Sequence, residues 1–155
     1  MCPSCGRESA RSWDSSGVRD RRSHAVLIPV SAVHDATARA VAYARSLRPT
    51  DVEAVFFATD SDEVQGVIAD WWDRGMNVPL AIVDAPFRDI GPPLLAEIRE
   101  RTRRGGTTVT VVLPEFVVNR WWEHALHNQT GFYIKRLLLL EPKVIVANVP
   151  VHIGA

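Results

Sequence analysis

The run Ala25-Val26-Leu27-Ile28-Pro29-Val30 is the clearest structural signal in the chain. All of its residues are apolar, without alternation, and several are β-branched, which is typical of a strand buried on both faces of a sheet. Residues 34–47 follow with apolar side chains at helical spacing and arginines on the opposite side, and Pro49 ends that pattern. The sequence therefore predicts a buried strand followed by an amphipathic helix.

Strand and helix patterns then alternate to the end of the chain. Further strands are predicted at residues 52–58, 80–83, 107–113 (closed by Pro114) and 144–149. Further helices are predicted at residues 60–72, 91–104 and 119–140, the last with an interruption at 128–131. Because right-handed crossovers pack helices on both sides of parallel strands, the predicted fold is α/β. It is a Rossmann-like three-layer sandwich around a five-stranded parallel sheet.

Length and charge narrow the class of protein. The chain has 155 residues, which fits one domain. Its 18 basic and 18 acidic side chains cancel, whereas a general nucleic-acid binder has a basic excess, so we expect no nucleic-acid partner. No run approaches the ~18 apolar residues of a membrane helix, so we expect no membrane insertion by the chain itself. Residues 1–23, rich in Ser, Arg, Asp and Gly, are predicted to be a flexible tail, and residues 24–155 one domain.

Two groups of residues suggest a metal site or catalysis. Cys2 and Cys5 have the spacing of half a tetrahedral zinc site, but these are the two cysteines of the chain and no second pair completes it. Without a disulfide scaffold, we expect a reducing cytoplasm. His124 and His127, with Glu115 upstream, suggest an enzyme, yet histidines beside tryptophans are more often packing groups. No zinc-protease, serine-hydrolase or phosphate-loop motif is present. We therefore expect no metal site and no catalysis.

A ligand site is expected at the carboxyl ends of the strands, where the strand order of such a sheet reverses. The loops at that edge are residues 30–35, 59–62, 84–91 and 114–120. Asp84, Arg88 and Asp89 follow the third predicted strand and suit ligand contact. Asp89 stands just before a helix, however, and we favour its interpretation as a helix cap.

The doublets Trp71-Trp72 and Trp121-Trp122 lie in predicted helices. On a helix with one buried side, one tryptophan of each pair is expected in the core and the other at an edge. Tryptophan is enriched in interface hot spots, so the exposed partner is a hint of dimerisation or docking.

The last third of the chain carries a distinctive string, in three pieces: Val112-Leu113-Pro114-Glu115-Phe116-Val117, Arg120-Trp121-Trp122-Glu123-His124 and Leu126-His127-Asn128-Gln129-Thr130. It resembles the cytosolic C-terminal domain of amino-acid permeases of the APC superfamily, a group that includes high-affinity potassium importers. The resemblance covers roughly residues 24–153. It implies a domain at the cytosolic face of a membrane permease, present here either as a separate copy or as a piece of a longer protein.

That permease domain is itself similar to universal stress proteins, which often bind ATP and dimerise. The hydroxyl-bearing residue near the end of the stress-protein signature corresponds to Thr130. Two positions depart from it: Ser31 stands where the stress-protein aspartate is expected, and Leu113-Pro114-Glu115-Phe116 replaces a glycine-rich phosphate loop. Pro114 has no N–H to offer a phosphate, and Glu115 repels one. We therefore expect no ordinary ATP binding.

Together these features predict a non-catalytic cytosolic regulatory domain, with a second copy of itself and a membrane permease as partners. The resemblance implies that it senses a nucleotide such as cyclic di-AMP. The alternatives are a ligand-free dimerisation or docking module, or a stand-alone ATP-binding stress protein. The nucleotide hypothesis rests on eight residues: Val30, Ser31, Thr59, Asp84, Arg88, Glu115, Gln129 and Thr130.

Overall fold

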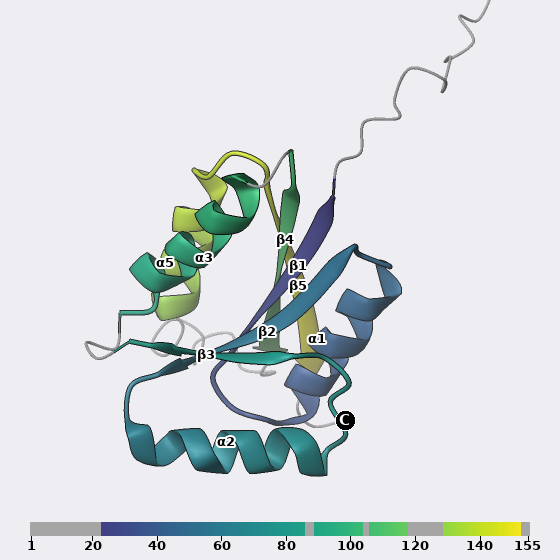
Figure 1. The fold of residues 1–155 in the computed structure, drawn as a ribbon, viewed down its shortest axis with the longest axis vertical. Helices are drawn as coiled ribbons and strands as arrows, with labels where there is room; N and C mark the ends of the chain where they lie inside the picture. Colours follow the sequence, from purple (N-terminus) through teal and green to yellow (C-terminus); the bar gives the residue numbers. More distant parts are fainter. Residues whose placement is uncertain (1–22, 86–88, 104–105, 118–128, 153–155) are drawn as a thin grey trace, which may run out of the picture.

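A computed structural model describes residues 23–85, 89–103, 106–117 and 129–152 (Figure 1). The predicted tail lies outside these residues except for Ser23, and so do both cysteines. The carbonyl of Ser23 accepts a hydrogen bond from the Thr108 N–H at 3.0 Å, which ties the start of the described chain to the sheet.

The described chain alternates strands and helices as predicted. In chain order they are β1 (His24–Val30), α1 (Asp35–Ser46), β2 (Asp51–Ala58), α2 (Ser61–Asp73), β3 (Leu80–Asp84), α3 (Gly91–Arg103), β4 (Thr108–Val117), α5 (Gln129–Leu139) and β5 (Val144–His152). The five strands form one sheet in the order β3-β2-β1-β4-β5, and every pairing is parallel. The predicted fold class is therefore confirmed.

The helices form two layers, one on each side of the sheet (Figure 1). Alternate residues of β1 contact opposite helix layers. Val26, Ile28 and Val30 pack with α1. Ala25 and Leu27 pack with α3 and α5 on the other face. Both sets are buried, which explains why the β1 sequence is apolar without alternation.

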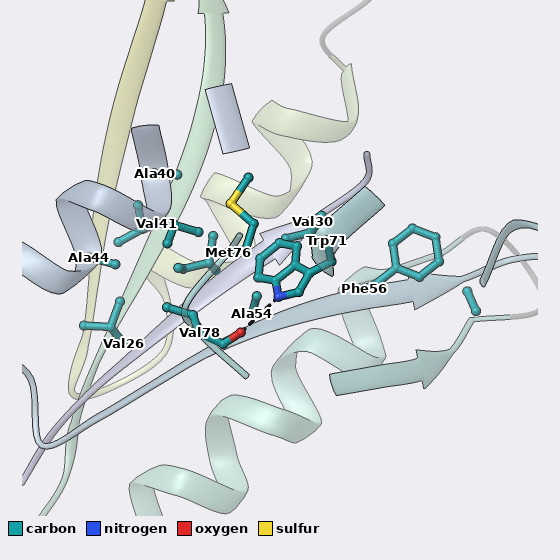
Figure 2. Packing of buried hydrophobic residues seen from close by; sticks show 13 residues of the cluster. Val26, Val30, Ala40, Val41, Ala44, Ala54, Phe56, Trp71, Met76 and Val78 are labelled. Carbon is teal, nitrogen blue, oxygen red and sulfur yellow. Dashed lines mark hydrogen bonds between the residues drawn. The ribbon is translucent and has the colours of Figure 1, made fainter. Parts of the chain in front are cut away.

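Trp71 anchors α2 to the core between α1 and the sheet (Figure 2). Its side chain is 2% exposed, and its Nε1–H donates a hydrogen bond to the carbonyl oxygen of Val78 at 3.0 Å. Trp72, the next residue, is 74% exposed. The expectation of one core and one surface tryptophan is confirmed for this doublet, and Trp121-Trp122 lies outside the described residues.

The predicted end of a strand at Pro114 is wrong. β4 continues through Pro114 to Val117, in unbroken register with β5 up to the pair Val117↔His152. The reason is the direction of the missing N–H. Thr108 donates its N–H toward β1, and alternate residues of a parallel strand face the same neighbour, so Pro114 also faces β1. The pairing of β1 with β4 ends at Leu27↔Val111, so the proline interrupts no pairing there.

Candidate functional site

The order of the strands reverses between β1 and β4, and prolines in both strands mark that point. The His24 carbonyl accepts the Thr50 N–H, so the backbone groups of His24 face β2. Successive residues of a parallel strand face opposite neighbours, so the N–H that Pro29 lacks would face β4. Pro29 and Pro114 thus remove the two donors that would extend the ladder beyond Leu27↔Val111. The two central strands stop pairing just where the topology predicts a ligand site.

Four of the predicted site residues lie at the carboxyl ends of β1, β2 and β3. Val30 is buried at the end of β1, and Ser31 after it is exposed. Thr59 is half-buried and follows Ala58, which lies in register with the exposed Asp84. The Ala85 N–H donates to the Ala58 carbonyl at 2.8 Å. The structure therefore brings Thr59 and Asp84 to the ends of neighbouring strands, with Ser31 at the end of the next one.

Glu115 does not lie in a loop at this edge, as the sequence had predicted. It is a residue of β4, on the face that packs against α3 and α5, and its carboxylate forms an ion pair with Lys135 of α5 at 3.0 Å. Both side chains are about one quarter exposed. Residues 113–117 form a strand paired with β5, so their backbone cannot form a phosphate-binding loop.

The remaining predicted residues are placed less fully. Gln129 and Thr130 are the first two residues of α5, so they stand at a helix N-terminus, where backbone N–H groups favour anions. Arg88 lies outside the described residues, as do His124 and His127. Within the described ranges, no group of three or more His, Cys, Asp or Glu side chains is arranged to hold a metal ion.

Acidic side chains dominate the described part of this edge. Asp89 accepts the Gly91 N–H at 3.1 Å, which confirms its interpretation as a helix cap. Asp60 accepts the Asp62 N–H at 3.2 Å at the start of α2. Asp35 begins α1 and pairs with Arg74 at 3.3 Å. Asp84 ends β3. Nearby carboxylates repel phosphates, so the described residues of this edge disfavour an anionic ligand.

His34 is a site residue that the sequence did not reveal. It caps α1: its ring Nδ1 accepts the Thr37 N–H at 3.3 Å and lies 3.2 Å from the Thr37 hydroxyl. That hydroxyl donates to the carbonyl of Ala32 at 2.7 Å, which fixes the loop after β1. The preferred capping residues are Ser, Thr, Asp and Asn, so a histidine gave no signal in the sequence.

The pKa of His34 is lowered from its ordinary value of 6.5. Burial is the main cause and Arg74 adds to it, whereas the backbone hydrogen bond of His34 and the charge of Asp35 oppose it. A neutral Nδ1 is also what the cap requires, because a protonated nitrogen cannot accept the Thr37 N–H and places a positive charge at a helix N-terminus.

Mild acidification is therefore expected to destabilise the fold through His34. Below pH 6.5 the unfolded chain binds the proton first, so the contribution of His34 to stability is complete above that pH. It is lost as the pH falls toward the lower pKa of the folded state. Urea unfolding between pH 7.5 and 5 measures this effect. A His34→Asn variant keeps a capping oxygen without titrating, so its stability should fall less; equal losses in both proteins would contradict the assignment.

Comparison with known proteins adds a family relationship. The family model described as the KimA potassium transporter C-terminal domain matches residues 21–151. The potassium transporter KimA of Bacillus subtilis (strain 168) is 25% identical over 130 residues, which cover 82% of this chain and 21% of the relative. The chain thus spans about a fifth of the length of that curated relative. Within the described ranges, none of the helices combines the length and apolarity needed to cross a membrane.

Proposed function

The chain belongs to the family of KimA potassium transporter C-terminal domains, and from this premise we propose that it is a non-catalytic domain that regulates a potassium transporter. The observation that carries the proposal is the match over residues 21–151, which spans all five strands from β1 to the Val151 position of β5. We place the domain, residues 24–155 behind a tail of residues 1–23, at the cytosolic face of the membrane. Its partners are then the transporter and a second copy of the domain.

The finer part of the proposal concerns the ligand. The resemblance to permeases of the APC superfamily, and through them to universal stress proteins, supports a nucleotide such as cyclic di-AMP at the carboxyl edge of the sheet. Ser31, Thr59 and Asp84 offer hydrogen-bonding groups there, and the backbone N–H groups at the start of α5, where Thr130 lies, can donate to a phosphate. In this proposal Arg88 supplies the positive charge that a phosphate needs and that the described residues of this edge do not offer. Binding regulates only if the nucleotide favours one of two arrangements of the domain.

A ligand-free docking or dimerisation module is the second candidate, and one observation favours it. The carboxylates at this edge, together with the Glu115–Lys135 pair, leave little positive charge for phosphates among the described residues. The stand-alone ATP-binding stress protein is the weakest candidate, because residues 113–117 form a paired strand where that function needs a phosphate loop.

A thermal-shift screen with ATP, ADP, AMP and cyclic di-AMP separates these candidates. Free nucleotide at ~100 times its Kd stabilises the domain by about 2.7 kcal/mol, or about 5–10 °C at this length. We expect a shift with cyclic di-AMP that Arg88→Ala removes. Arg45→Ala, an exposed arginine in the last turn of α1, is the matched control and should leave the shift unchanged. A flat response to every nucleotide would reject nucleotide sensing and favour the ligand-free module.

A further inference from the structure

The outer surface of α2 has no covering element among the described residues. In this helix only Trp71 is fully buried, while Val64 and Val67 pack partly on the core. The opposite side is exposed along its whole length. We call it the α2 face and define it by these exposed residues: Asp62, Gln65, Gly66, Ala69, Asp70, Trp72 and Asp73.

Trp72 is the most prominent apolar group of the α2 face. A tryptophan that is 74% exposed leaves a large apolar area in water, and buried tryptophans are frequent anchors of protein interfaces. Ala69 and Gly66 lie in the two preceding turns and are also exposed, and a Cβ at Gly66 would meet no atom within 4 Å. The centre of the α2 face therefore carries small side chains, so a partner segment can approach the helix backbone closely.

The charges of the α2 face are all of one sign, and those of Asp70 and Asp73 are badly placed for the helix itself. Asp70 and Asp73 lie in the last turn, which contains no basic residue, although a helix C-terminus favours cations. Among the described residues neither carboxylate has an ion-pair partner, and the same holds for Asp62. Asp62 suits the N-terminus of α2, whereas Asp70 and Asp73 do not stabilise its C-terminus, and the C-cap residue Arg74 pairs with Asp35 of α1 instead of with them. A cationic partner would complement the charges of Asp70 and Asp73.

The sign of the charge selects the partner. Anionic lipid headgroups repel this face, so it does not lie on the membrane surface. Cytoplasmic loops of membrane proteins carry an excess of Lys and Arg. The chain matches 21% of its transporter relative, so the rest of such a transporter supplies loops of this kind. We propose that the α2 face docks onto a Lys/Arg-rich cytoplasmic segment of the transporter, with Trp72 as the apolar anchor; this rests on the proposed regulatory function.

The test measures binding of a fluorescein-labelled peptide of about six Lys and Arg residues around two leucines to the full chain, by anisotropy. The affinity should fall as salt rises. Trp72→Ala should weaken binding by about tenfold or more, and the double variant Asp70→Asn with Asp73→Asn by about three- to tenfold. Tyr43→Ala on α1 and Asp51→Asn on β2, both exposed, are matched controls and should bind as the wild type does.

Three results would overturn the proposal. The first is equal peptide affinity in the α2 variants and the controls. The second is binding to phosphatidylserine vesicles in place of the peptide. The third is a change in oligomeric state caused by Trp72→Ala, which would make a second copy the occupant. The nucleotide thermal shift is measured on the same samples. If the shift persists while peptide binding is absent, the docking surface fails and the regulatory function stands; the reverse result rejects nucleotide sensing alone.

Discussion

Trp71→Ala is expected to lower the free energy of unfolding by about 3–5 kcal/mol. The indole is 2% exposed and lies among core residues contributed by α1, β1 and β2 (Figure 2). Alanine would leave a large cavity between α2 and the sheet. It would also leave the carbonyl oxygen of Val78 without the donor that now lies 3.0 Å away. Because Trp71 is the only fully buried residue of α2, the helix should lose its main attachment, and the partly buried Val64 and Val67 would remain.

Urea unfolding followed by circular dichroism measures this loss. Trp72→Ala is the matched control, since it removes the same side chain from the neighbouring position, where the indole is 74% exposed. Its stability should stay within about 0.5 kcal/mol of the wild type. If the two variants lost similar free energy, the arrangement of the doublet described here would be incorrect.

Leu138→Ala should be the next most damaging change, with a loss of about 2–5 kcal/mol. Leu138 is 1% exposed and belongs to the second core layer, where α5 meets α3 and β4. The same buried cluster contains Ile98 and Val111, both fully buried. A cavity here would loosen α5, whose first residues belong to the candidate nucleotide site.

The adjacent leucine again supplies the control. Leu139 is 78% exposed, so Leu139→Ala should change the unfolding free energy by no more than about 0.5 kcal/mol. Thermal midpoints and urea curves of the two single variants make the comparison. A destabilising Leu139→Ala beside a neutral Leu138→Ala would place the other side of α5 against the sheet.

The architecture was predictable because its signals are local. A strand covered on both faces must be apolar throughout, and the β1 run shows this directly. Alternation of strands and helices then requires parallel pairing. The end of β4 was not predictable, since the effect of Pro114 depends on which neighbour its missing N–H would face. That direction follows from register and strand order, which the sequence does not contain.

The candidate site was predictable only in its position. The predicted strand ends correctly brought Thr59 and Asp84 to one edge of the sheet, whereas ligand binding there stays a prediction. The Glu115–Lys135 pair joins residues from a strand and a later helix, so no local spacing indicates it. The cap at His34 depends on a side-chain rotamer and on the loop after β1, and neither leaves a pattern in the sequence.

Potassium uptake tests the central claim most directly. The Bacillus subtilis relative would be compared in three forms at equal abundance: intact, lacking the fifth of its length that this chain matches, and with that fifth replaced by this chain. If the domain is regulatory, the truncated form should differ from the intact protein in uptake rate, and the replacement should restore the rate of the intact protein. A coupling free energy of about 1 kcal/mol would change the rate about fivefold. Identical uptake by the truncated form and the replacement, both well folded in the membrane, would contradict the account.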